Sequence, residues 1–155
     1  MFKNKFLTFI LFFVTTYSAS LIGGLATIKF KEPWYSMLNK PIFNPPDWIF
    51  APVWTTLYLM MTISIWIFWH SKHRDTNTLY IYFIHLIFNT TWSIVFFVFH
   101  KMLLASIVLI FLIVLIAILI LRYKRVTMIS AYLMIPYLLW CCFALFLNFN
   151  LILLN

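Results

Sequence analysis

Five apolar runs, each about as long as the roughly 20-residue helix that crosses a bilayer, follow one another along this chain of 155 residues. The runs do not alternate polar and apolar residues with a period of two, and they are too long for barrel strands of about 10 residues. The sequence therefore predicts an all-α integral membrane protein. We expect residues 1–155 to form one bundle of five transmembrane helices, at residues 6–28, 48–69, 79–99, 102–121 and 128–149.

The composition agrees with this class of protein. Hydrophobic residues make up 65% of the chain and charged residues 9%, which is more apolar surface than one small water-soluble core could bury. The net charge of +8 is not arranged as a stripe that would fit nucleic acid. We therefore interpret the positive charge as a signal for orientation and as contact with anionic lipids of the bilayer.

Basic residues between the apolar runs predict the orientation. With the N-terminus inside, seven cations lie on the inner side and four on the outer side, as the positive-inside rule favours. The inner set is Lys3, Lys5, Lys72, Arg74, Arg122, Lys124 and Arg125, and the outer set is Lys29, Lys31, Lys40 and Lys101.

The first run has two further interpretations. Basic residues and an apolar stretch precede small residues at 18–20, as in a cleavable signal peptide, but the apolar run continues to Ile28. Small residues recur at four-residue spacing at Ala19, Gly23 and Thr27. This spacing predicts close packing against another helix, either from the same chain or from a second subunit.

Prolines and tryptophans concentrate between Trp34 and Tyr58. Proline fixes φ and pushes the preceding residue out of the helical region, so the segment favours a stiff, extended course. We interpret residues 29–47 as a lid over a pocket, and the alternative is an aromatic belt at the membrane interface. The next run contains Pro52, which we expect in the first turn of its helix.

Polar and aromatic residues share faces inside three of the runs. Trp54 and Tyr58 lie four residues apart, and Asn89, Trp92 and Phe96 follow at helical spacing in the third run. An amide and an indole on one stripe favour the interior of the bundle over lipid.

The fifth run contains Pro136, which predicts a kink or a side-chain partner for the freed carbonyl. After this proline, Trp140, Ala144, Leu147 and Asn148 share one face, and small Ala144 leaves room for a flat cavity.

Two residue patterns leave alternatives open. His85 lies well inside the third run, where it is either a hydrogen-bonded packing residue or an axial haem ligand. Residues 121–125 (Leu-Arg-Tyr-Lys-Arg) fit a loose sterol-contact pattern, which a basic interfacial loop explains equally well. Cys141 and Cys142 are adjacent and lack CxxC spacing, so we interpret both as apolar packing residues.

Three stretches on separate runs form one longer pattern. They are Trp34-Tyr35, Leu38, Lys40-Pro41, Pro45-Pro46, Trp48, Phe50, Pro52-Val53-Trp54-Thr55 and Leu57-Tyr58; then Asn89, Trp92-Ser93 and Phe96-Phe97; then Pro136-Tyr137-Leu138-Leu139-Trp140, Phe143-Ala144, Leu147-Asn148 and Asn155. In these stretches the chain resembles the translocator protein family, also called the tryptophan-rich sensory proteins or peripheral-type benzodiazepine receptors, and in particular its bacterial members.

The resemblance implies a homodimer in the bacterial cell membrane. It also implies a pocket that binds porphyrins, such as protoporphyrin IX and haem-like tetrapyrroles, and benzodiazepine-type or isoquinoline ligands, with a role in tetrapyrrole transport or regulation. The predicted ligand-binding residues are Trp34, Pro41, Pro45, Trp48, Trp54, Tyr58, Asn89, Trp92, Phe96, Trp140, Phe143, Ala144 and Asn148. The chain departs from the family at Met61, where a glycine is common, and no Tyr and basic residue follow Asn148, so the usual C-terminal sterol motif is absent.

Other function classes remain. Some relatives promote light-dependent breakdown of protoporphyrin IX, which would make Trp54 and Trp140 the candidate catalytic residues. No triad, paired-carboxylate or metal-ligand set is present in the sequence, so we expect no metal site and no required cofactor. A purely structural membrane partner would explain the apolar runs, but not the polar and aromatic residues that share inward faces of the helices. An ion-coupled pump is disfavoured because the interiors of the runs lack charged residues.

Overall fold

The computed structural model describes residues 4–155, and Lys3 of the orientation argument lies outside the described residues. Residues 4–155 contain helices and no strand. The elements are α1 (Lys5–Phe30), α2 (Trp34–Met37), α3 (Asp47–Trp69), α4 (Thr76–Ser93), the π-helix η1 (Ile94–Val98), α5 (Met102–Lys124) and α6 (Met128–Leu154). Five of them, with η1 counted as part of α4, are long and apolar enough to cross a membrane. The predicted all-α membrane bundle is confirmed.

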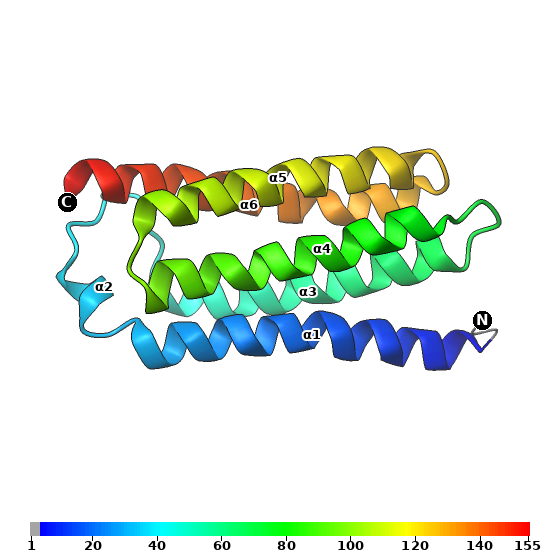
Figure 1. Ribbon diagram of the computed structural model, residues 1–155, viewed down its shortest axis with the longest axis horizontal. Coiled ribbons are helices and arrows are strands. Elements are labelled where there is room, and N and C mark those ends of the chain that lie inside the picture. Colours follow the sequence, from blue (N-terminus) through cyan, green and yellow to red (C-terminus); the bar gives the residue numbers. More distant parts are fainter. Residues whose placement is uncertain (1–3) are drawn as a thin grey trace.

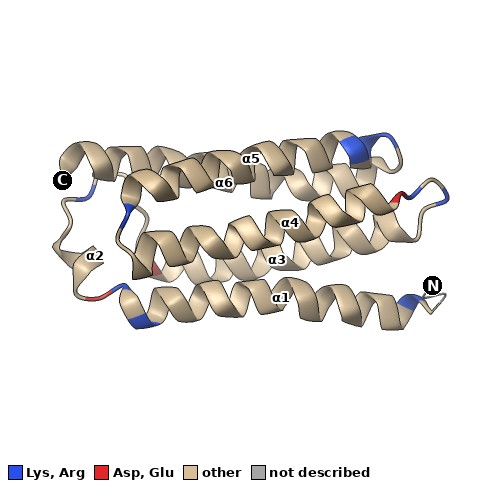
Figure 2. Cartoon of the chain, viewed as in Figure 1, with Lys and Arg blue, Asp and Glu red and all other residues tan. Residues whose placement is uncertain are grey.

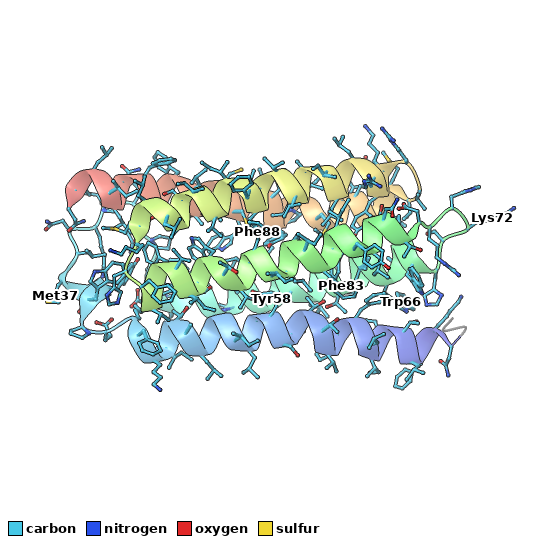
Figure 3. All side chains as sticks on the ribbon, viewed as in Figure 1. Met37, Tyr58, Trp66, Lys72, Phe83 and Phe88 are labelled. Carbon is cyan, nitrogen blue, oxygen red and sulfur yellow. The ribbon has the colours of Figure 1, made fainter. Side chains whose placement is uncertain are left out.

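The five long helices run side by side along the long axis of the molecule (Figure 1). In this view α1 lies at one edge and α5 with α6 at the other, and α1 packs against α3, α4 and η1. The short helix α2 and its flanking loops cover one end, near the last turn of α6. Met37 of α2 and Lys72 of the α3–α4 loop mark opposite ends of the bundle (Figure 3).

Basic residues gather at the two ends of the bundle and leave the middle uncharged (Figure 2). Lys5 lies at the same end as the basic loops after α3 and α5, and the set that begins with Lys29 lies at the opposite end. The two sets used to predict orientation are therefore separated in space, and the orientation itself stays a prediction.

The long helices extend beyond the predicted spans. Helix α4 begins at Thr76, where the Asp75 side chain accepts a hydrogen bond of 2.8 Å from the Thr78 backbone N–H and so caps the helix. Helix α6 continues to Leu154, because the polar Asn150 amide is satisfied within the helix by a 2.8 Å bond to the Phe146 carbonyl.

The two prolines inside helices lie deeper than first turns. Helix α3 begins at Asp47, so Pro52 occupies the second turn, and its expected place in the first turn is wrong by about one turn. Helix α6 runs as one element from Met128 through Pro136 to Leu154. Apolar surroundings favour keeping the remaining helical hydrogen bonds on both sides of each proline.

The small residues of α1 pack against the same chain. The Thr90 hydroxyl lies 3.4 Å from the Ala19 carbonyl, to which it donates. A Cβ atom on Gly23 would lie 3.1 Å from the Ser93 hydroxyl oxygen, so glycine permits the close approach of α4. Nearer the N-terminus of α1, the hydroxyls of Thr16 and Tyr82 are 2.5 Å apart in the buried core.

Tyr123 belongs to the core and not to the lipid-facing surface. Its side chain is fully buried, and its ring centroid lies 4.8 Å from that of Phe68. The tyrosine of the sterol-contact pattern at 121–125 is therefore directed into the bundle, which leaves the basic interfacial loop as the explanation of that pattern.

Candidate ligand-binding cavity

A cavity of about 580 Å³ lies between the long helices in the half of the bundle nearer α2. Residues from α1, α2, α3, α4, η1 and α6 line it, and most of the lining is aromatic or aliphatic. The volume falls within the range of roughly 300–1,000 Å³ that small-molecule sites occupy, and such sites combine apolar walls with a few polar groups.

Aromatic rings in contact with one another form a continuous wall of this cavity. Trp54 of α3 has its ring centroid 5.6 Å from that of Tyr58 and 6.3 Å from that of Trp92 on α4. Trp92 stacks on Phe96 of the π-helix at 5.8 Å, with 25° between the ring planes. The wide turn of η1 thus carries part of the wall, as π-turns often do at functional sites.

A hydrogen-bonded layer closes the bottom of the cavity. The Tyr58 hydroxyl donates to the Asn89 side-chain oxygen, and the Asn89 amide donates to the Tyr137 hydroxyl at 2.9 Å. All three residues are buried, and they come from α3, α4 and α6. Tyr58 lies near the middle of the bundle (Figure 3). This layer fixes the positions of the three helices relative to one another along the bundle axis, because a buried polar group in an apolar medium needs its partner.

Small side chains leave space on the cavity walls. A Cβ atom on Gly24 of α1 would meet no heavy atom within 4 Å, apart from its own helix. Ala144 and Asn148 line the cavity from α6, and the Asn148 amide donates to the Met102 carbonyl at 3.2 Å.

Two polar atoms at the walls have no hydrogen-bond partner among the described residues. They are the indole nitrogen of Trp92 and the side-chain oxygen of Asn148, and both are covered by neighbouring atoms. An unpaired buried polar group costs about 1–3 kcal/mol, and neighbouring side chains would have to move before a ligand in the cavity could bond to either atom.

Charged residues form the rim at the end nearer α2. The Lys31 ammonium pairs with the Asp47 carboxylate and lies 3.8 Å from that of Glu32, and all three residues line the cavity. Beside them Tyr35 is buried, and burial raises the pKa of its hydroxyl, which donates to the Asn44 side chain at 3.3 Å. The rim can therefore meet the polar end of a ligand while the aromatic walls hold its body.

The structure brings together six of the thirteen predicted ligand-binding residues around the cavity. They are Trp54, Tyr58, Trp92, Phe96, Ala144 and Asn148. Asn89 does not line the cavity itself but is hydrogen-bonded to Tyr58, which does. The other six do not line the cavity: Trp34, Pro41, Pro45, Trp48, Trp140 and Phe143.

The remaining predicted tryptophans have other neighbours. Trp34 stacks on His100 with a centroid distance of 4.3 Å, and Trp48 is 72% exposed. The ring centroid of Trp140 lies 5.9 Å from that of Phe50, which lines the cavity, while Trp140 itself does not. His85 is fully buried below the cavity, with its Nδ1 atom against the Tyr82 carbonyl, which agrees with the packing interpretation.

Sequence reasoning missed several lining residues. Lys31, Tyr35 and Asp47 come from the segment interpreted as a lid, and their pairing links the end of α1 to the start of α3. A possible signal was the position of Asp47, directly after two prolines and before an apolar run, where it starts a helix. Within residues 4–155, no three His, Cys, Asp or Glu side chains group closely enough to hold a metal ion.

Five membrane-length helices around an aromatic cavity define a small polytopic membrane protein with a cavity between its helices. Comparison with known families agrees with this class. The TspO/MBR family model matches residues 9–154, and the chain belongs to this family.

Named relatives cover most of the chain. A tryptophan-rich protein TspO from Chlorobaculum tepidum is 35% identical over 141 residues, which is 86% of each chain. A protein of the same name from Archaeoglobus fulgidus is 36% identical over 134 residues, which is 86% of this chain and 87% of that one. The translocator protein of Ovis aries is 32% identical over 121 residues, or 76% of this chain and 72% of the relative.

Proposed function

We propose that this protein binds porphyrin-type tetrapyrroles, such as protoporphyrin IX, in the cavity between its helices and serves in their transport or regulation. The same cavity would accept benzodiazepine-type and isoquinoline ligands. The observation that carries the proposal is the pair of adjoining indoles, Trp54 and Trp92, on the wall of a cavity of about 580 Å³. The names of the relatives, translocator and tryptophan-rich sensory protein, favour a role in transport or sensing.

The physical argument is one of shape and contact. A flat aromatic ligand gains from stacked or edge-on contact with indole and phenyl rings, and each such pair contributes about 0.5–1.5 kcal/mol beyond buried area. A cavity lined by Trp54, Trp92 and Phe96 offers several of these contacts at once. Polar substituents on the ligand would reach the rim at Lys31 and Asp47.

We also propose that residues 29–47 act as the lid of the cavity. Reciprocal hydrogen bonds join this segment to α6: the Asn39 backbone N–H donates to the Asn155 side chain at 2.9 Å, and the Asn155 amide donates to the Asn39 carbonyl at 3.1 Å. Phe43 also stacks on Phe146 at 5.2 Å. A homodimer in a bacterial cell membrane, with the N-terminus inside, completes the proposed arrangement.

The first prediction tests binding directly. Titration of the purified protein in lipid nanodiscs with protoporphyrin IX in darkness is expected to quench tryptophan fluorescence and to saturate at one ligand per chain. Trp54→Phe and Trp92→Phe should each lose part of the quenching, because these indoles line the cavity. The matched control is Trp48→Phe, since Trp48 is exposed. An unsaturable curve that follows the lipid concentration would refute binding in the cavity.

Light-dependent breakdown of the bound porphyrin is a second candidate function. The observation that favours it is the position of the Trp54 indole, which is easily oxidised, in the wall that a ligand would touch. Trp140 is the other candidate for this chemistry, but it packs on Phe50 and is not among the residues that line the cavity.

The second prediction separates the two tryptophans. With porphyrin bound in air and light, Trp54→Phe is expected to slow the spectral loss of the ligand, while Trp140→Phe reacts like the unmodified protein. Phenylalanine keeps a stacking surface, so dark affinity should fall less than the reaction rate. If free porphyrin bleaches as fast and to the same products as bound porphyrin, the protein is a binder and not a catalyst.

A further inference from the structure

The cavity has an exposed edge, and this edge lies between α1 and α3. Among the lining residues, Ile28 at the end of α1 is 81% exposed, and Ala51 and Thr55 on the facing side of α3 are also exposed. The lining residues contributed by α4, η1 and α6 are buried or half-buried. Glu32 and Asp47 of the charged rim are exposed as well, so the opening runs along the side of the bundle between α1 and α3 and reaches the rim.

Two links between α1 and α3 frame this opening. On the side nearer α2 the Lys31 ammonium pairs with Asp47, and further along the helices the Tyr17 hydroxyl donates to the Thr55 carbonyl at 3.1 Å. Asp47 and Thr55 are eight residues apart on α3, which at 1.5 Å per residue gives a height of about 12 Å. Between the links, α1 carries Gly24, where an added Cβ would meet open space.

The opening lies at the depth of the lipid chains. Both flanking helices have the length and hydropathy of membrane spans, and the ion pair falls at their ends, directly after Phe30 and at the first residue of α3. The neighbouring outer surface of α1 carries Leu21 and Leu25, which are 63% and 56% exposed. Apolar side chains exposed on a spanning helix face lipid.

Beside the charged rim, the end of the bundle toward water is covered, and Glu32 and Asp47 are the lining residues that stay exposed there. Tyr35 is buried there against Phe96 and Phe97, with ring centroids 6.3 Å and 6.0 Å apart. The reciprocal bonds between Asn39 and Asn155 hold the loop after α2 onto α6. A ligand that entered from water would have to break these contacts or pass between the charges of the rim, whereas a ligand dissolved in the bilayer meets the lateral opening directly.

We propose that the cavity is loaded from within the bilayer, through a lateral portal formed by Gly24, Ile28, Ala51 and Thr55. Its ligand is then a membrane-dissolved amphiphile: the flat apolar body passes between α1 and α3, and the polar end stays at the Lys31–Asp47 pair. This inference rests on the proposed binding of porphyrin-type ligands and adds the route and the amphipathic character of the ligand.

The third prediction tests the portal by the rates of binding. Gly24→Phe places a ring in the open space of the portal and is expected to slow both association and dissociation of protoporphyrin IX in nanodiscs by about tenfold or more, because a blocked entry acts on both directions alike. The dissociation constant should change far less. Leu25→Phe is the matched control and should bind at the unmodified rates, since Leu25 is exposed on the outer surface of α1 and does not line the cavity.

Loosening the loop provides the opposing test. Asn155→Ala removes the bonds to Asn39 and should leave both rates unchanged if entry is lateral. Faster binding in this variant, together with unchanged rates in Gly24→Phe, would overturn the portal in favour of entry through the loop. A loss of affinity in Gly24→Phe without slower rates would also overturn it, because Gly24 would then be only part of the wall.

A labelling experiment does not depend on porphyrin. Ala51→Cys is combined with Cys142→Ala, because Cys142 is exposed while Cys141 is buried. The introduced thiol is expected to react faster with a lipid-soluble maleimide than with a charged, membrane-impermeant one. Equal or faster reaction with the charged reagent contradicts a portal facing lipid. If the lipid-soluble reagent is preferred but porphyrin binding never saturates, the portal stands and the proposed ligand class fails.

Discussion

Asn89→Ala is expected to destabilise the folded bundle by about 1–3 kcal/mol, because hydrogen bonds between membrane helices contribute about 0.6 kcal/mol on average and up to about 1.7 each. Asn89 both accepts from the Tyr58 hydroxyl and donates to that of Tyr137, so one substitution leaves two buried hydroxyls without their partner. The measurement is the midpoint of thermal unfolding in lipid nanodiscs. Without these hydrogen bonds α3, α4 and α6 would be free to shift relative to one another beside the cavity, so ligand binding should also weaken.

The control for Asn89 is an asparagine that joins no second helix. Within residues 4–155, the Asn150 side chain donates only to the Phe146 carbonyl of its own helix. Asn150→Ala should therefore change the midpoint little. A double variant with Tyr58→Phe provides a stricter test, since the effects of Asn89→Ala and Tyr58→Phe should not add if the two side chains act together. Additive effects would show that the layer does not work as a unit.

Ala144→Thr is expected to weaken binding of a bulky flat ligand by about 1–3 kcal/mol, because added atoms in a close-fitting site force the ligand or its neighbours to move. This corresponds to roughly a five- to 150-fold rise in the dissociation constant. The protein should still fold, since Ala144 borders empty space. Equilibrium titration with protoporphyrin IX in darkness measures the effect.

A second alanine-to-threonine change separates ligand contact from general damage. Ala117 is half-buried on α5, outside the cavity lining, so Ala117→Thr should leave the dissociation constant unchanged. Unchanged affinity in a well-folded Ala144→Thr protein would place the ligand elsewhere in the molecule.

The membrane spans, and the residues that share a face near the centre of a helix, could be predicted from the sequence. Apolar length predicts a spanning helix because the bilayer fixes the length required. The spacing of Trp54 with Tyr58, and of Trp92 with Phe96, predicts a shared face because both steps are close to one helical turn. All four of these residues line the cavity, although their role in binding stays a prediction.

Longer steps along a helix are less reliable. A step of four residues drifts by about 40°, so Trp140 and Asn148, eight residues apart, point in directions that differ by about 80°. Asn148 and Ala144 consequently line the cavity, while Trp140 packs on Phe50. The pattern that grouped these residues on one face was correct for adjacent turns and too broad over two turns.

The loop could not be derived from the chain alone. Its anchors join residues far apart in the sequence, such as Asn39 with Asn155 and Trp34 with His100, and no local propensity encodes those pairs. The π-helix after Ser93 is similarly invisible, since its residues Ile94–Val98 suit an ordinary helix as well. Both features are consequences of packing between distant segments.

The lateral opening between α1 and α3 has a consequence for handling the protein outside a membrane. A detergent monomer has an apolar tail and a polar head, so it matches the opening in the same way as a lipid-dissolved ligand does. In micelles the tail can occupy the space beside Gly24 while the head lies near Lys31. Apparent affinities should then weaken as detergent concentration rises, and crystals grown from detergent should be inspected for a tail in this position.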